Sequence, residues 1–276
     1  MAKLRKRKIG LALGSGVARG LAHIGVLGVM QREGIPIDMI VGTSAGAVVG
    51  ALFAQGKDAS LIKELAISIG LKRMASLVDL VLPKAGLIGG KKIINWLGLI
   101  MGGDIKFSDL RIPFACVATN IHTCEEVVIK KGSVLEGIRA SMSIPAIFTV
   151  VRWQGRYLVD GSLINPVPVS VTREMGADFI IAVNVIPDRS EIAHQVDSER
   201  GEKIKEPNIF SVMIQSVHIA SCALVSHFLE GADIVIHPKV AHIHPSNFLQ
   251  AQECILQGEL AAQAAMPEIK RLLAVH

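Results

Sequence analysis

A serine within a glycine-flanked pentapeptide is the residue of this chain best placed to do chemistry. Ser44 stands in Gly42-Thr43-Ser44-Ala45-Gly46, directly after an apolar, strand-like run and directly before a helix-like run. A sharp strand-to-helix turn lifts a serine hydroxyl clear of its neighbours, and glycines two residues before and after let the backbones pass closely. The helix N-terminus behind it places positive partial charge near a developing oxyanion. The pattern predicts that Ser44 is a nucleophile that attacks an ester.

An aspartate late in the chain could supply the base that this serine needs. Asp160-Gly161-Ser162 follows a predicted strand and opens a turn. An Asp-Gly pair on its own is more typical of an Asx turn than of catalysis. Together with the serine motif, however, it makes Asp160 the candidate general base.

A glycine-rich loop follows the first predicted strand. It lacks the third glycine of a dinucleotide-binding loop and the lysine of a phosphate-binding loop, because Arg19 occupies the position of that glycine. An oxyanion loop requires only backbone N–H groups that point into the site. We therefore expect an oxyanion loop made of Ser15, Gly16, Val17, Ala18 and Arg19.

Histidines near the C-terminal end leave a second choice of base open. In α/β-hydrolases the triad follows the chain order serine, acid, histidine. No late histidine of this chain stands in a local pattern that singles it out. The candidates are His218, His227, His237, His242, His244 and His276.

Two strand-helix units open the chain and must position these residues. Strands are predicted at 9–13 and 37–41, and a helix follows each, one over about 21–30 and one over about 44–55. This order is typical of a parallel α/β layer. The low aromatic content of 4% and the abundance of Ala, Val, Ile and Leu suit a buried parallel sheet. We predict a three-layer α/β fold with a mostly parallel central sheet and helices on both faces. Further strands are expected at 113–119, 126–130, 147–151, 156–159, 179–185 and 234–236.

The charge of the chain is concentrated at its N-terminus. Five of the first eight residues are basic, which leaves 24 basic against 24 acidic residues in the remainder. We expect residues 1–8 to be a basic tail, either solvated or in contact with acidic lipid headgroups, and residues 9–276 to form one domain. Without a basic stripe elsewhere, nucleic-acid binding is not expected.

Two apolar segments bear on membrane contact. Residues 60–105 are mostly helical in pattern, and they pack in the core or form a mobile cap that guards an apolar pocket or contacts a bilayer. Residues 208–229 are long enough to span a bilayer, but polar side chains such as Gln215 and His218 favour a packed amphipathic helix. Residues 197–207 are strongly charged and are expected to be a solvated loop.

The cysteines indicate neither a metal site nor disulfides. Cys116, Cys124, Cys222 and Cys254 show no zinc-ligand spacing, and buried thiols in a reducing compartment are the plain interpretation. Glycines and Arg19 interrupt the apolar run that a signal peptide would need. We expect a cytoplasmic protein, peripheral to the inner membrane face if it contacts lipid, with no metal and no cofactor.

Three segments together resemble the patatin-like phospholipase family, in the family's order. They are residues 11–27 (LALGSGVARGLAHIGVL), 42–46 (GTSAG) and 160–168 (DGSLINPVP). The pattern extends over most of residues 8–270, including 140–145 (ASMSIP) and 176–183 (GADFIIAV), and is similar to that of small single-domain bacterial members.

The resemblance implies a Ser-Asp dyad without histidine, in which Ser44 is the nucleophile and Asp160 the general base. Ser15 and Val17 depart from the family's G-G-G-x-R/K-G loop, and Ser162 replaces the usual glycine or alanine of the third motif. A β-branched Val17 is unfavourable if that position needs a positive φ.

Three functions remain open from the sequence. The first is a serine esterase that cleaves acyl esters of phospholipids or lysophospholipids through an acyl-enzyme. The second is an esterase with a Ser-Asp-His triad. The third is a weakly active regulatory or lipid-sensing protein on the same fold, which the departures at Val17 and Ser162 favour.

Overall fold

A single mixed sheet organises the part of the chain that the structure describes. The computed structural model describes residues 7–68, 76–82, 86–188, 191 and 208–274. The strand order is β5-β6-β3-β2-β1-β7-β8, and β4 pairs with β3. The strands are β1 (Ile9–Leu13), β2 (Met39–Thr43), β3 (Phe114–Asn120), β4 (Glu126–Ile129), β5 (Val151–Trp153), β6 (Arg156–Asp160), β7 (Phe179–Val183) and β8 (Ile234–Ile236).

The centre of the sheet is parallel and one edge is antiparallel. β8, β7, β1, β2 and β3 pair in parallel, whereas β4 and β6 run antiparallel to β3, and β5 runs antiparallel to β6. The strands β1, β2, β3 and β7 are buried along their whole length, which explains why they consist of small and β-branched apolar residues.

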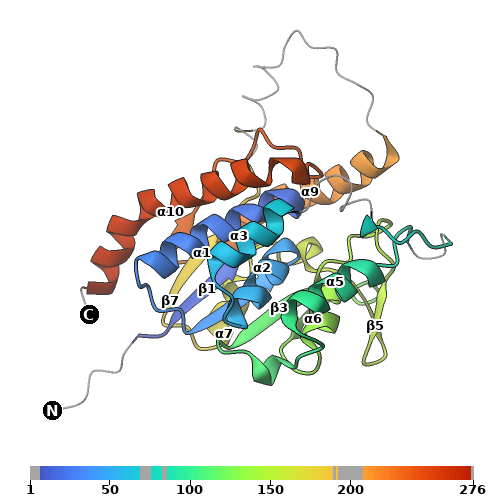
Figure 1. The fold of residues 1–276 in the computed structure, drawn as a ribbon, viewed down its shortest axis with the longest axis horizontal. Coiled ribbons are helices and arrows are strands. Elements are labelled where there is room, and N and C mark those ends of the chain that lie inside the picture. The colour runs from blue at the N-terminus through green and yellow to red at the C-terminus, as the bar shows by residue number, and fades with distance from the viewer. Residues whose placement is uncertain (1–6, 69–75, 83–85, 189–190, 192–207, 275–276) are drawn as a thin grey trace, which may run out of the picture.

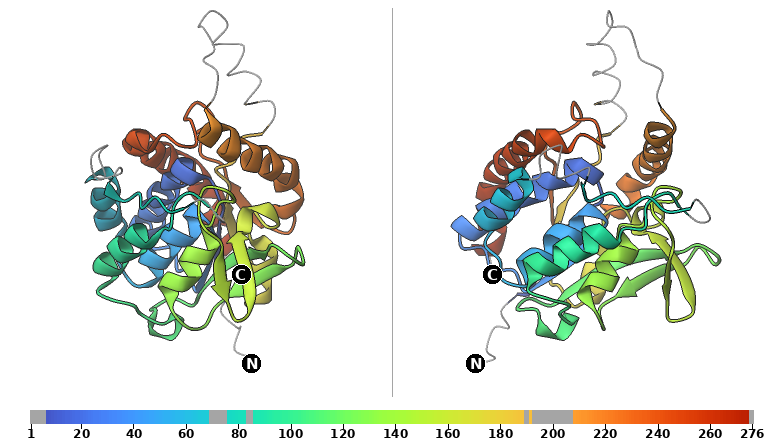
Figure 2. Two further views of the ribbon diagram at one scale, coloured as in Figure 1. Left: turned by 90° about the vertical axis from the view of Figure 1, so that its right-hand side faces the viewer. Right: turned by 45° about the vertical axis from the view of Figure 1, so that its right-hand side comes forward.

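Helices cover both faces of the sheet. α1, α2, α3 and α10 lie together on one face (Figures 1 and 2), where α1 and α10 pack along each other. α7 packs on the other face against β1, β2 and β7. The predicted three-layer, mostly parallel α/β fold is confirmed. The helices are α1 (Ala22–Arg32), α2 (Ala45–Ala54), α3 (Ala59–Ser68), α5 (Lys91–Met101), α6 (Val134–Ser141), α7 (Val169–Glu174), α9 (Ile209–Phe228) and α10 (Ala251–Ala274).

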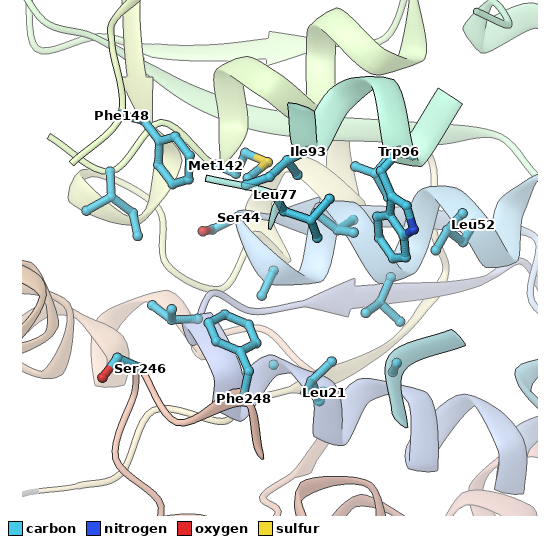
Figure 3. Close-up of a pocket in the computed structure, with 18 of the residues that line it drawn as sticks. Leu21, Ser44, Leu52, Leu77, Ile93, Trp96, Met142, Phe148, Ser246 and Phe248 are labelled. Atoms are coloured by element: carbon cyan, nitrogen blue, oxygen red, sulfur yellow. The ribbon is translucent and has the colours of Figure 1, made fainter. Parts of the chain in front are cut away.

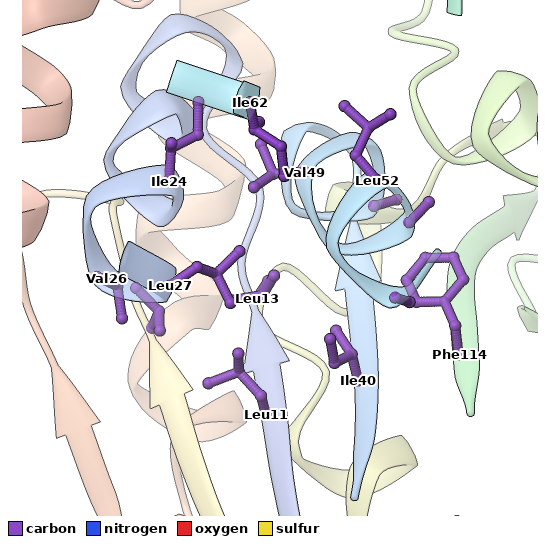
Figure 4. Close-up of a cluster of buried hydrophobic side chains, with 14 of the residues drawn as sticks. Leu11, Leu13, Ile24, Val26, Leu27, Ile40, Val49, Leu52, Ile62 and Phe114 are labelled. Carbon is purple, nitrogen blue, oxygen red and sulfur yellow. The ribbon is translucent and has the colours of Figure 1, made fainter. Parts of the chain in front are cut away.

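Alternating residues of β1 supply both layers of the core. Leu11 and Leu13 face the layer of α1, α2 and α3, where Leu27 and Val49 are fully or almost fully buried beside them (Figure 4). Ala12 belongs to the opposite cluster. Burial on both faces holds the strand ends rigidly, and the candidate site lies at those ends.

The predicted strand at 147–151 is wrong over most of its length. Ala146 has a φ of 65° and turns the chain, so that Ile147 and Phe148 are buried in a small cluster against α9. Pairing begins only at β5, and a hairpin turn around Gln154 joins β5 to β6. β2 begins two residues later than predicted and runs directly to the serine. The helices α6 and α7 were not predicted.

The apolar segment at 60–105 contains two helices, α3 and α5, with residues 69–75 and 83–85 outside the described part. Two leucines of this segment, Leu80 and Leu82, are exposed at 75% and 80%. α9, predicted as a packed helix, places Met213 and Val217 against the cluster of Ile147 and Phe148. No helix among the described residues is both long and apolar enough to cross a bilayer.

Most of the expected tail and the whole of the charged loop lie outside the part of the chain that the structure describes. Residues 1–6 and 192–207 lie outside the described residues. Arg7 lies over the ring of Phe179, 5.9 Å from its centroid, and the N–H of Lys8 donates to Asp178. Residues 7 and 8 of the expected tail therefore contact the body of the protein.

Candidate active site

Two strands meet end to end at the candidate site. β2 runs parallel to β3 and β6 runs antiparallel to it, and both use the same flank of β3. Thr43 pairs with Val117, and Asp160 pairs with the next residue, Ala118. The C-terminal ends of β2 and β6 therefore point at each other. This register brings Ser44 and Asp160 together although they are 116 residues apart in sequence.

The side chains of these two residues form a direct hydrogen bond. Ser44 Oγ donates to Asp160 Oδ2 at 2.7 Å. Both residues are buried, with exposed fractions of 4% and 1%. The other carboxylate oxygen, Oδ1, accepts the backbone N–H of Ser162 at 2.8 Å, which fixes the plane of the carboxylate. The arrangement holds a hydroxyl group against a base with little water present.

Burial changes the basicity of the aspartate. Loss of hydration raises the pKa of Asp160 to about 6, although hydrogen bonds from Ser162 and Ser44 oppose the rise. A carboxyl group of ordinary pKa is a weak base toward a serine hydroxyl. The higher pKa makes Asp160 a better proton acceptor while leaving it mostly ionised at neutral pH.

The serine sits on a strained turn that long-range contacts hold. Ser44 has a φ of 54° and a ψ of −116°, which is unfavourable for a residue with a side chain. Its backbone N–H donates to Ser141 Oγ at 2.9 Å, and Ser141 in turn donates to the carbonyl of Val117 at 2.6 Å. Ser141 therefore ties the turn to β3. Sequence reasoning included Ser141 only within a matching segment and gave it no role.

The two glycines of the motif are required by close backbone contacts. A Cβ on Gly42 would lie 2.5 Å from the carbonyl oxygen of Gly46. A Cβ on Gly46 would lie 2.2 Å from the carbonyl oxygen of Leu13 in β1. Backbone atoms cannot move aside as a flexible side chain can, so these positions exclude larger residues.

The glycine-rich loop runs beside the serine, and two of its N–H groups have no acceptor among the described residues. Ser15 N–H donates to Pro166 and Ala18 N–H donates to Pro245. Within the described part of the chain, the N–H groups of Gly16 and Val17 have no acceptor, and both residues line a small cavity with Ser44 and Asp160. The loop can therefore offer donors to an oxyanion. Val17 has a φ of 52°, so the strain foreseen for a β-branched residue is present.

Arg19 braces the loop from behind. Its Nε donates to the carbonyl of Ile243 at 2.6 Å, and its Nη2 donates to that of Ala241 at 2.9 Å. Its Nη1 lies 2.9 Å from His218 Nε2. The side chain is buried, and burial lowers its pKa to about 10. These contacts attach the loop to the segment between β8 and α10.

Of the late histidines that the structure describes, His218 is the one that lies beside the candidate site. It lines the cavity that contains Ser44 and Asp160. Because arginine can only donate, His218 Nε2 must accept from Arg19, which requires a neutral ring. Burial and the charge of Arg19 lower its pKa to about 4. Among the described residues, Asp160 is the acceptor of the Ser44 hydroxyl. His276 lies outside the described part.

An apolar cavity of about 380 Å³ opens at Ser44. Its lining is almost entirely aliphatic and aromatic, and in Figure 3 Ser44 lies near one end while Trp96 and Leu52 lie at the other. Met142 and Phe148 stand over the serine, and Leu21 and Phe248 close the opposite side. Such a cavity fits the hydrocarbon part of a ligand whose polar group remains near Ser44.

Arg139 on α6 connects the strand end at Asp160 to the segment before α5. Its guanidinium donates to the carbonyls of Gly89 and Thr149 and to Ser143 Oγ. The carbonyl of Ser143 accepts the backbone N–H of Asp160 at 2.8 Å. Sequence reasoning missed Arg139, because its partners lie up to 60 residues away from one another in the chain.

Metal ligands are not grouped in the described part of the chain. No set of three or more His, Cys, Asp or Glu residues there is arranged to hold a metal ion. The site consists of a hydroxyl group, a carboxylate, free backbone N–H groups and an apolar cavity.

Comparisons with known proteins point to one family. Residues 11–173 match the family model described as "Patatin-like phospholipase". The chain is 36% identical over 186 residues to Lysophospholipase NTE1 of Scheffersomyces stipitis, which covers 66% of this chain and 12% of that protein. It is 31% identical over 231 residues to human Patatin-like phospholipase domain-containing protein 6, covering 77% of this chain and 17% of that protein.

A bacterial relative and a solved structure extend the comparison. An uncharacterized NTE family protein of Mycobacterium tuberculosis is 35% identical over 178 residues, covering 64% of this chain and 49% of its own length. The chain thus spans half or less of these relatives. The crystal structure of VipD from Legionella pneumophila superposes with a TM-score of 0.61 over 98% of this chain and 67% of VipD, at 15% identity. VipD therefore supports the fold alone.

Proposed function

Because this chain belongs to the patatin-like phospholipase family, we propose that it hydrolyses acyl esters of phospholipids or lysophospholipids through Ser44 and Asp160. The 2.7 Å hydrogen bond from Ser44 Oγ to Asp160 Oδ2, at the opening of an apolar cavity, is the observation that supports this most directly. A lipid ester presents a carbonyl beside a hydrocarbon chain, and the site presents a nucleophile beside a hydrocarbon-lined cavity.

The proposed reaction has two steps. Asp160 accepts the proton of Ser44 as its oxygen attacks the ester carbonyl, and the free N–H groups of Gly16 and Val17 stabilise the oxyanion. The tetrahedral intermediate collapses, the alcohol leaves with the proton returned from Asp160, and an acyl-serine remains. Asp160 then takes a proton from water, whose oxygen attacks the acyl-serine. When this second intermediate collapses, Asp160 returns the proton to Ser44 Oγ and the fatty acid is released.

Lysophospholipids are the substrates we propose to test first. The fungal relatives are named lysophospholipases. A cavity of about 380 Å³ is near the lower end of the range for ligand pockets, which suits one acyl chain better than two.

Hydrolysis of a short p-nitrophenyl ester and of lysophosphatidylcholine tests the proposal. We expect Ser44→Ala and Asp160→Asn each to lose activity on both substrates, while His218→Gln, which can still accept from Arg19, stays active. An unchanged rate in Asp160→Asn would contradict the dyad. Loss of activity in His218→Gln with Arg19 still in place would instead support the Ser-Asp-His triad. His218 is the histidine to test, because it lines the same cavity as Ser44 and Asp160.

The strained backbone of Val17 favours one further candidate, a lipid-binding protein with little turnover. Val17→Gly removes the β-branched side chain at a φ of 52° and keeps the N–H group. If this strain limits the oxyanion loop, Val17→Gly should hydrolyse the ester faster than the wild type. Binding of lysophosphatidylcholine without turnover in both proteins would support the lipid-sensing function.

We also propose peripheral contact with a membrane and a cytoplasmic location. The exposed leucines before α5 and the basic residues at the N-terminus support contact with an anionic lipid surface. Among the described residues, Cys116, Cys124, Cys222 and Cys254 form no disulfides, which supports a reducing compartment.

A further inference from the structure

We infer that Trp96 closes the far end of the apolar cavity and thereby sets the length of the acyl chain that Ser44 releases. The inference rests on the proposed function only in that the acyl chain of the substrate occupies this cavity. It concerns a residue outside the dyad and the oxyanion loop, and it assigns to α5 the selection of substrate length.

One wall of the cavity is a straight track along α2. Ser44, Val48 and Leu52 are spaced four residues apart, so their side chains follow one face of the helix. All three line the cavity. At a rise of about 1.5 Å per residue, Ser44 and Leu52 are separated by about 12 Å along the helix axis. A chain attached to Ser44 therefore runs along α2 toward Leu52.

The opposite wall is a matching face of α5. Ile93, Trp96 and Leu97 line the cavity from this helix. Figure 3 shows Ile93 near Ser44 and Met142, and Trp96 beside Leu52 at the other end, with its indole directed toward α2. The two helices thus enclose a channel whose length is limited at the position of the indole.

Trp96 differs from Leu52, which lies beside it, and from Leu97, the next residue of α5, which both also line the cavity. Leu52 and Leu97 are almost fully buried and belong to the core, so they cannot be removed without loss of packing. Trp96 is half-buried and packs against the outside of the core. Its large indole therefore separates the channel from the surface, and its removal lengthens the channel without emptying the core.

Hydrolysis of a chain-length series measures the selection. For p-nitrophenyl esters from butyrate to palmitate, kcat/KM of the wild type should rise by about fourfold per added methylene while each is buried, and then fall once the chain reaches Trp96. Trp96→Ala should move the maximum to longer chains. Val48→Phe, which narrows the track one turn after Ser44, should move it to shorter chains.

A matched control separates this effect from a general loss of folding. Trp153, the other tryptophan of the chain, lines a different cavity between α6 and β5. Trp153→Ala should leave the position of the maximum unchanged. A maximum that does not move in Trp96→Ala, or that moves equally in Trp153→Ala, would overturn the inference.

A binding measurement tests the channel without any turnover. In the Ser44→Ala, Trp153→Phe double variant, Trp96 is the sole tryptophan, so its emission reports contact with a bound chain. Titration with fatty acids from butyrate to palmitate should change the emission only above a threshold length. A threshold length found without any hydrolysis by the wild type would keep Trp96 as the end of the channel that limits the bound acyl chain, and would refute the proposed hydrolysis. Hydrolysis by the wild type without a threshold length in the titration would keep the proposed function and overturn the role of Trp96.

Discussion

The proposed activity requires the ionised form of Asp160, whereas the stability of the fold favours its neutral form. Its side chain is buried because β6 ends inside the sheet, and this burial raises its pKa to about 6. A base must be ionised to accept a proton, whereas a buried charge that lacks full solvation destabilises the folded state. The same side chain should therefore limit the rate at low pH and the stability at higher pH.

The first prediction concerns the pH dependence of activity. We expect kcat/KM on a short ester to fall about tenfold per pH unit below about pH 6, as Asp160 becomes protonated. The measurement is a pH-rate profile at low substrate concentration. A profile that stays flat through pH 6 would contradict the assignment of Asp160 as the base.

The second prediction concerns the stability of Asp160→Asn. The folded protein binds the Asp160 proton more tightly than the unfolded chain, whose pKa is near 3.8, so stability is lost as the pH rises from about 4 to about 6. At pH 7 the amide should unfold with a free energy higher by up to about 3 kcal/mol, while activity is lost. Urea unfolding of both proteins at pH 7 measures the difference, and at pH 4 the difference should largely disappear.

The third prediction concerns Ser141 as a positioning residue. Ser141→Ala leaves the N–H of Ser44 without its acceptor on a turn at a φ of 54°. An unsatisfied buried donor costs about 1–3 kcal/mol, and if this cost falls on the transition state, kcat drops by about 5-fold to 150-fold. KM and the midpoint near pH 6 should stay unchanged, because neither the cavity nor Asp160 is altered. Ser108→Ala, at an exposed serine, is the control.

At the scale of elements, the position of α2 against β1 decides where the serine points. The helix begins directly after Ser44, and its first turn lies against the backbone at the end of β1. This contact is possible only with glycine at position 46. The geometry of the nucleophile thus depends on how closely a helix and a strand approach, in addition to the local turn.

A pair of glycine substitutions tests this contact. Gly46→Ala would place a Cβ 2.2 Å from the carbonyl oxygen of Leu13, and should lower the free energy of unfolding by about 1–3 kcal/mol or more and abolish activity. Gly28→Ala, on α1, meets only side-chain atoms at 3.5 Å and beyond, and should raise stability by about 0.5–1 kcal/mol. Thermal unfolding and ester hydrolysis of both variants check the contrast. Equal effects of the two substitutions would show that the close approach is not limiting.

At the scale of the whole molecule, the positive charge lies at one end of the chain. The net charge is +5, and the excess comes from the first eight residues. Attraction of a basic segment to anionic lipid contributes about 1 kcal/mol per Lys or Arg near the surface and weakens with salt. Membrane contact through this segment should therefore be electrostatic.

Neutralising part of this charge tests the contact. The triple variant Lys3→Gln, Arg5→Gln, Lys6→Gln leaves Arg7 and its contact with Phe179 intact. We expect it to bind vesicles containing phosphatidylglycerol about 100-fold more weakly at low salt, and to hydrolyse a short soluble ester normally. Co-sedimentation with these vesicles at increasing salt measures the effect. Equal binding of both proteins would place the lipid contact elsewhere, with the exposed leucines before α5 as the next region to test.

Local patterns in the sequence predicted the parts of this protein that depend on neighbouring residues. The nucleophile turn at Ser44, the alternation of strands and helices and the free N–H groups of the glycine-rich loop all follow from residues close together in the chain. The departure at Val17 also predicted strain, and Val17 does adopt a positive φ. The short helices α6 and α7 were missed, although Ser133, three residues before Glu136, is an N-cap signal for α6. At eight and six residues they are too short to be stable without tertiary packing.

The register of β3 with its neighbours decided what those parts do together. Ser44 meets Asp160 because β2 and β6 end on adjacent residues of β3, and no local pattern encodes that alignment. Tertiary packing likewise decides the supporting contacts of Ser141 and Arg139 and the cavity between α2 and α5. Side chains far apart in the chain come within hydrogen-bonding distance only when packed elements fix their positions. The sequence therefore suggested Ser44 and Asp160 as candidate groups, and the tertiary structure decided that they meet.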